Sequence, residues 1–311
     1  MKAAVLLLGD SRSRFLFAEY GPRVCRPMSC DSSAYCAQAT ALWPRDNRWS
    51  AGAAACSSSN NLTRMGYYAH MGVALAPPYW HNPSHYHDFF EPNGNQTPPT
   101  SLDLMLHAVH EFQQSLPLAT PVVVVFSSFM WDLARKWEYF PQQSDDDWLH
   151  EYEANLTTVA HALKRNLQGH NVVTSHAHQL VVVADYGCWA TPPASPFCAH
   201  AHHNSSKLDL LVERAAAAVT TVANRMGLPL VNLAPIFQKR WRALVLEEGE
   251  GHKYHHPNSA GCSVEWAALV RLLPWLAVPE HTAVSGNQNG TPRGTPLMKL
   301  WHSSSVAVGA V

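Results

Sequence analysis

The chain has 311 residues, of which 47% are hydrophobic and 14% charged, and its formal net charge is −1 at pH 7. This length and apolar content suffice for one large core, and the near-neutral charge excludes nucleic acid or an anionic membrane as a partner held by charge. No run of about 18 apolar residues occurs, so we predict no membrane span.

Short apolar runs predict five strands, at residues 3–8, 65–71, 121–126, 180–185 and 228–233. Continuous Val and Leu, without alternation, is typical of a parallel sheet buried on both faces. Apolar periodicity and capping signals predict helices at residues 102–116, 147–168, 207–226 and 260–275, with Gly227 as the C-cap of the third. This order predicts an α/β fold, a doubly wound three-layer α/β/α sandwich with a five-stranded, mostly parallel sheet.

The domain is predicted to span residues 1–278 and to carry two long loops, 21–62 and 77–100. Both loops precede the first predicted helix and would lie near the carboxyl edge of the sheet, where selectivity is usually built. Residues 279–311 are polar and rich in Gly, Ser and Thr, and we expect a disordered tail.

Cysteines and glycosylation motifs indicate an oxidising compartment. Four of the seven cysteines fall within residues 25–56, and Cys188 and Cys198 bracket a Pro-rich loop, which predicts disulfides and leaves a seventh as a free thiol or interchain partner. Five sequons favour the secretory lumen or the exterior; they are Asn61, Asn95, Asn155, Asn204 and Asn289. No signal peptide is visible, so the leader of a secreted form would be missing from this chain.

The motif with the most chemical content is Gly9-Asp10-Ser11, directly after the first apolar run. A buried strand that ends at a glycine and passes to a serine presents a hydroxyl at the carboxyl edge of a parallel sheet. His256-Pro257-Asn258 precedes the last predicted helix, and a serine and a histidine in this order suit a nucleophile and its base. The alternatives are a serine N-cap for Ser11 and an ordinary helix-start histidine for His256.

With these motifs, the chain resembles the SGNH/GDSL hydrolase superfamily over roughly residues 3–276. Gly9-Asp10-Ser11-x-x-Arg14 and Trp131-Asp132-Leu133 are similar to the PC-esterase and related glycan O-acyl branch. The resemblance implies the flavodoxin-like SGNH hydrolase fold, with Ser11 as nucleophile and His256 as base. It also implies that Gly72 and Ser127 join the Ser11 N–H in the oxyanion hole. Supporting roles are implied for Asp10, Arg14, Trp131 and Asp132.

Two positions depart from the family pattern. Ser127 stands where the family usually has an asparagine, and a hydroxyl reaches less far than an amide. Lys253 stands where the family has an aspartate, three residues before the histidine; if His255 were the base, the position would be His252. A glutamate of the preceding loop, Glu248 or Glu250, or a backbone carbonyl would then orient the imidazole.

The resulting hypothesis is a serine esterase or acyltransferase that acts on O-acyl esters, first of all O-acetyl esters of glycans, without a metal or organic cofactor. Its partner would be a small acyl ester or an O-acylated glycan, with no nucleic acid and no membrane span. The alternative is a catalytically weakened pseudoenzyme that binds carbohydrate. A third hypothesis, a His-rich metal-binding protein, rests on two clusters without a familiar ligand spacing: His81, His85 and His87, and His200, His202 and His203.

Overall fold

The computed structural model describes residues 3–24, 53–57, 63–70, 72–76, 100–116, 120–128, 130–169, 179–186, 189–190, 205–245, 253–254 and 257–273. All of them belong to the first of two units, Met1–Ala277. The second unit, Val278–Val311, lies outside the described residues, as do the predicted tail, residues 77–99 and most of the predicted loop 21–62.

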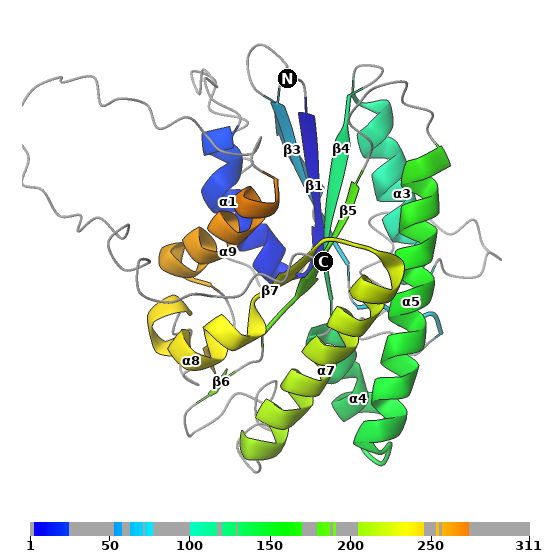
Figure 1. The fold of residues 1–311 in the computed structure, drawn as a ribbon, viewed down its shortest axis with the longest axis vertical. Helices are drawn as coiled ribbons and strands as arrows, with labels where there is room; N and C mark the ends of the chain where they lie inside the picture. The colour runs from blue at the N-terminus through cyan, green and yellow to red at the C-terminus, as the bar shows by residue number, and fades with distance from the viewer. Residues whose placement is uncertain are drawn as a thin grey trace, which may run out of the picture. The chain divides into compact units, whose positions relative to one another are not determined.

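The five predicted strands form the parallel part of the main sheet (Figure 1). They are β1 (Ala3–Gly9), β3 (Thr63–Ala69), β4 (Val122–Ser128), β5 (Gln179–Ala184) and β7 (Leu230–Asn232). A sixth strand, β2 (Ala53–Ser57), pairs antiparallel with β3 at the edge of the sheet, in a segment where the sequence predicted a loop. The strand order is β2-β3-β1-β4-β5-β7.

The four predicted helices are present, with ends within three residues of the predicted ones: α3 (Ser101–Gln114), α5 (Asp145–Gly169), α7 (Ser205–Met226) and α9 (Ser259–Leu272). Gly227 has φ +62, as its predicted role at the end of α7 requires. Three more helices were not predicted: α1 (Ser11–Val24), which extends into the predicted loop 21–62, α4 (Met130–Tyr139) and α8 (Ala234–Leu244). A two-stranded sheet pairs β6 (Trp189–Ala190) with β8 (Lys253–Tyr254).

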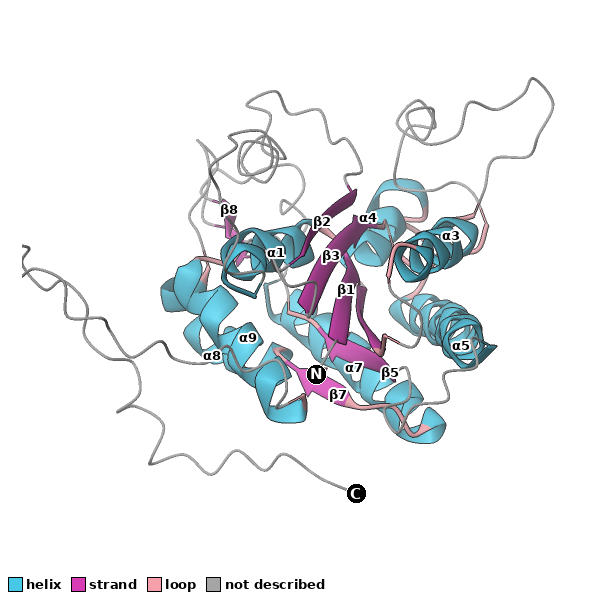
Figure 2. Ribbon diagram, turned by 90° about the horizontal axis from the view of Figure 1, so that it is seen from above, coloured by secondary structure: helices cyan, strands magenta, loops and turns pink. Residues whose placement is uncertain are grey.

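Helices cover both faces of the sheet, which gives the predicted three layers (Figures 1 and 2). Successive residues of β1 explain this, because Leu6 and Leu8 point into one core while Val5 and Leu7 point into the other. Side chains of α3, α4, α5 and α7 complete the first core, and side chains of α1, α8 and α9 complete the second. A sheet buried on both faces accounts for strands made of unbroken apolar residues.

The topology determines where a ligand can bind. Among the parallel strands the order is β3-β1-β4-β5-β7, so the chain moves from β1 to one side and then returns to the other side at β4. In open α/β sheets the crevice at such a switch point, outside the carboxyl ends of the strands, holds the site. Here those ends carry Gly9-Asp10 on β1 and Ser127-Ser128 on β4.

Several predictions concern residues outside the described ranges. This holds for Cys25, Cys30, Cys36, Cys188 and Cys198, and therefore for the predicted disulfides, whereas Cys262 is a buried side chain of the second core. Of the five sequons only Asn155 is described, and it is half-buried in α5. None of the described helices is both long enough and apolar enough to cross a membrane.

Candidate functional site

The turn between β1 and α1 places Ser11 at the first residue of a helix. The Asp10 carboxylate accepts a hydrogen bond from the Arg12 backbone N–H at 2.8 Å and so caps α1. The N-cap role considered for Ser11 is therefore filled by its neighbour. The first N–H groups of a helix have no partner within it and carry its positive dipole, so the backbone of this turn suits an anionic oxygen. The Ser11 side chain is outside the described part of the chain.

Ser127, at the end of β4, contacts the first turn of α1. Its hydroxyl is 3.2 Å from the hydroxyl of Ser13, and its side chain is buried, with an exposed fraction of 3%. A Cβ added to Gly9 would overlap the Ser13 hydroxyl and lie 2.6 Å from the Ser127 hydroxyl. The glycine at the end of β1 is thus required by the close approach of β4 and α1.

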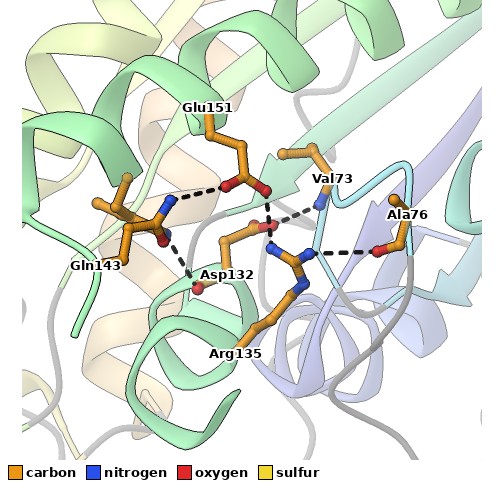
Figure 3. A network of polar contacts seen from close by, with 7 residues as sticks. Val73, Ala76, Asp132, Arg135, Gln143 and Glu151 are labelled. Carbon is orange, nitrogen blue, oxygen red and sulfur yellow. Dashed lines mark hydrogen bonds and ion pairs between the residues drawn. The ribbon is translucent and has the colours of Figure 1, made fainter. Parts of the chain in front are cut away.

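Gly72 lies in the turn after β3, in a backbone conformation (φ +90) that favours glycine. The turn is held by Asp132 of α4, whose Oδ1 accepts from the Val73 N–H at 2.8 Å (Figure 3). The other carboxylate oxygen accepts from the Ser128 hydroxyl at 2.9 Å. Burial raises the pKa of Asp132 to about 6, although both hydrogen bonds oppose this shift. Asp132 therefore joins the Gly72 turn to the end of β4.

A second set of contacts extends this anchor to α5 (Figure 3). Arg135 donates to the Ala76 carbonyl at 3.3 Å and pairs with Glu151 at 2.9 Å. Gln143 donates to the other oxygen of Glu151 at 2.9 Å. The segment from Gly72 to Ala76 is thus held by α4, whose Arg135 is held in turn by Glu151 of α5.

A buried charged cluster, which the sequence analysis missed, begins at Arg12, the second residue of α1. The Arg12 guanidinium donates to the Tyr186 carbonyl at 2.6 Å, pairs with Asp185 at 3.1 Å and stacks over the Tyr186 ring. Burial raises the pKa of Asp185 to about 6, and the charge of Arg12 opposes this. Burial and the neighbouring carboxylates Asp185 and Asp10 raise the pKa of Glu265. Arg12 thereby ties the start of α1 to the end of β5.

Sequence reasoning could find part of this cluster. Asp185 is a polar residue at the end of a predicted apolar strand, which is a usable signal at the carboxyl edge of a sheet. Arg12 and Glu265 carry no such signal, because Tyr186 is 174 residues from Arg12 and Asp185 is 80 residues from Glu265 in the chain.

Two further predicted residues lie near the turn. The Tyr67 hydroxyl donates to the Asp10 carbonyl at 3.3 Å. Burial raises the pKa of Tyr67, and the charge of Arg14 opposes this shift. Trp131 is buried at the start of α4, next to Asp132.

His256 and the alternative base His255 lie outside the described residues, and of Lys253 only the backbone is described. The residues on either side of His255 and His256, which are Tyr254 and Pro257, each pair with another segment of the chain. Tyr254 pairs with Trp189, and Pro257 bridges to Val245. Asn258 caps α9 by accepting from the Gly261 N–H at 2.9 Å, so the helix opens at the predicted motif.

The start of α1, the Gly72 turn and the hydroxyls of Ser13 and Ser127 thus lie at one edge of the sheet. Backbone N–H groups and hydroxyls of this kind can bind an oxyanion. Within the described ranges, no three His, Cys, Asp or Glu side chains could hold a metal ion. The two histidine clusters of the metal hypothesis, at residues 81–87 and 200–203, lie outside those ranges.

Comparison with protein-family models and with curated proteins finds no match. Among solved structures, a member of the lipolytic G-D-S-L family from Veillonella parvula matches at 8% identity and a TM-score of 0.40, over 88% of this chain and 98% of that chain. Est24, a carbohydrate acetylesterase from Sinorhizobium meliloti, matches at 12% identity and a TM-score of 0.43, over 88% and 100%. An aryl esterase from M. smegmatis matches at 10% identity and a TM-score of 0.46, over 88% and 100%.

These similarities are low by both measures, and they assign neither an activity nor a site residue to this chain. By their descriptions, the three structures are a G-D-S-L family member and two esterases.

Proposed function

We propose that this protein is an SGNH-type serine esterase or acyltransferase with Ser11 as its nucleophile. The observation that carries the proposal is the position of Ser11, at the first residue of α1 and at the carboxyl end of β1, where the strand order reverses. A nucleophile at a helix start has backbone donors beside it, and these donors stabilise the charge that its attack creates.

In this mechanism the Ser11 hydroxyl attacks the carbonyl carbon of an ester while His256 takes the hydroxyl proton. The carbonyl oxygen becomes an oxyanion that accepts from the N–H groups of Ser11 and Gly72 and from the Ser127 hydroxyl. The C–O bond to the alcohol then breaks, and the leaving alkoxide receives the proton from His256. Water, or a glycan hydroxyl in a transferase, attacks the acyl-serine in the same way and releases Ser11.

One observation supports the donor role of Gly72. Its turn is anchored to the end of β4 through Asp132, so its amide has a fixed place near the switch point.

The proposal for His256 is supported by its neighbours in the sequence. Trp189, the partner of Tyr254, follows Tyr186 by three residues, a chain length of about 11 Å at most. Tyr186 accepts from Arg12, the residue after Ser11. The segment before His256 is therefore tied to the same end of the sheet as the proposed nucleophile.

The substrate class, O-acyl esters of glycans, rests on the resemblance of the Ser11 and Trp131 motifs. The cysteines and sequons favour the secretory lumen or the exterior as the compartment.

One observation favours the second candidate, a carbohydrate-binding pseudoenzyme. The Ser127 hydroxyl is buried and already lies 3.2 Å from the Ser13 hydroxyl. The Ser13 hydroxyl therefore competes with a substrate oxyanion for the hydrogen bond that Ser127 would donate. Losing one such donor lowers kcat on the order of 10²–10³-fold.

The experiment is covalent labelling with a fluorophosphonate probe, together with initial rates of hydrolysis of an aryl acetate and an acetylated xylo-oligosaccharide. We expect labelling and hydrolysis in the wild type and in the control Ser115→Ala, at the exposed end of α3, and neither in Ser11→Ala. A folded wild type that is not labelled and hydrolyses neither ester would refute the esterase. Binding of the oligosaccharide by that protein would establish the pseudoenzyme.

A further inference from the structure

His70 directly follows β3, and its backbone continues the pairing of β3 with β1. Its N–H donates to the Gly9 carbonyl at 3.0 Å. Gly9 is two residues before the proposed nucleophile, and His70 is two residues before Gly72. The backbone of His70 therefore links the turn that carries Ser11 to the turn that carries Gly72.

The His70 ring is buried between these turns and β4, with an exposed fraction of 4%. It stacks on the Phe126 ring, with centroids 5.2 Å apart and planes inclined by 16°. The Nε2 atom is 2.8 Å from the Ser127 carbonyl, and the Nδ1 atom is 3.3 Å from the Gly72 carbonyl. One side chain thus touches the two elements that supply the proposed oxyanion donors Gly72 and Ser127.

The shorter of the two contacts favours one tautomer of the ring. A carbonyl oxygen only accepts hydrogen bonds, so the nitrogen 2.8 Å from it carries the hydrogen. Burial lowers the pKa of His70, which keeps the ring neutral at neutral pH with a single N–H. Placed on Nε2, that N–H donates to the Ser127 carbonyl, and the 3.3 Å contact of Nδ1 with the Gly72 carbonyl is then packing and not a hydrogen bond.

We propose that His70 is a positioning residue of the oxyanion hole, which holds the Gly72 turn in place against the ends of β1 and β4. The inference rests on the proposed function, since only an esterase needs these donors aligned. Oxyanion donors act within about 2.7–3.1 Å of one oxygen atom, and a misplacement of about 1 Å can lower the rate about 10²-fold. Asp132 holds the Val73 N–H of the turn, so the turn is fixed at two points.

The test compares two substitutions at His70. Gln places an amide N–H near the position of Nε2 and can still donate to the Ser127 carbonyl, whereas Phe keeps the stacking on Phe126 and has no donor. We expect His70→Phe to lower kcat about 10²-fold with little change in KM, and His70→Gln to recover most of that loss. Hydrogen exchange of the amides in residues 72–76 should be faster in His70→Phe than in the wild type.

The matched control is Val109→Ala, a fully buried position of α3. It should lower the free energy of unfolding without changing kcat or the exchange of residues 72–76. If His70→Phe does not fold, His70→Asn replaces it, because its shorter amide cannot reach the Ser127 carbonyl; the same loss of kcat is expected.

The outcomes separate this inference from the proposed function. Unchanged kcat in His70→Phe, beside hydrolysis that Ser11→Ala abolishes, overturns the role of His70 alone. Equal losses of kcat in His70→Phe, His70→Gln and Val109→Ala also overturn it, because stability would then explain them. A wild type without Ser11-dependent labelling refutes the esterase and the role of His70 with it.

Discussion

Gly72→Ala tests the packing of the proposed oxyanion turn. Gly72 has φ +90, and an L side chain in the left-handed region costs roughly 1–2 kcal/mol. The added Cβ would lie 2.6–2.8 Å from three atoms of the Asp132 carboxyl group. At that distance either the carboxyl group or the turn has to move.

The size of the effect follows from the contact that such a movement breaks. The Val73 N–H donates to the Asp132 carboxylate at 2.8 Å, and a hydrogen bond to a charged group contributes about 1.5–3 kcal/mol. Together with the backbone term, the free energy of unfolding should fall by roughly 2.5–5 kcal/mol. Because the turn also carries a proposed oxyanion donor, kcat should fall on the order of 10²–10³-fold.

Gly227→Ala is the matched control, since Gly227 also has positive φ (+62) but an added Cβ there would meet no atom within 4 Å. It should lose only the backbone term, roughly 1–2 kcal/mol, and keep the wild-type kcat. Urea unfolding followed by fluorescence and circular dichroism measures the first quantity, and initial rates with an acetyl ester measure the second. Equal losses of stability in the two variants, or an unchanged kcat in Gly72→Ala, would contradict the reasoning.

Three further substitutions test other parts of the structure. Asp132→Asn should gain stability over the wild type by roughly 2–3 kcal/mol as pH rises from about 4 to 7.5. The reason is that a carboxyl pKa raised from 3.8 to about 6 makes the wild type lose stability over that range. Urea titrations that give the same difference at both pH values would exclude this. Arg12→Met should lower the free energy of unfolding by about 3–5 kcal/mol, because it leaves Asp185 buried without its ion pair. Adding Asp185→Leu should restore part of the lost stability, and a double variant no more stable than Arg12→Met would refute this. Gly66→Ala should lower the free energy of unfolding by about 1–3 kcal/mol, because the added Cβ would lie 2.6 Å from the Phe112 ring. In a double-mutant cycle Phe112→Leu should relieve this clash, and additive losses of stability would argue against the contact.

The strong elements of the fold could be predicted from local sequence. The Val-rich runs of β4 and β5 are buried on both faces and leave no other interpretation, and α5 and α7 are long enough to show their apolar period. The missed elements have weaker signals. Strand β2 consists largely of alanine in a Ser-rich segment, and α4 and α8 are short helices next to strands.

Sequence alone determined the α/β class and the order of the five parallel strands and of four helices, α3, α5, α7 and α9. It also singled out Ser11, Gly72 and Ser127 as a hypothesis. These results depend on local patterns, because burial on both faces and tight turns restrict which residues can follow one another. Only the tertiary structure decided that Asp132 holds the Gly72 turn, that Arg12 reaches the end of β5 and that His70 joins β1, β3 and β4. Each of these contacts joins residues at least 57 positions apart in the chain. The strand order brings these residues together, and the local sequence of a single segment does not determine that order.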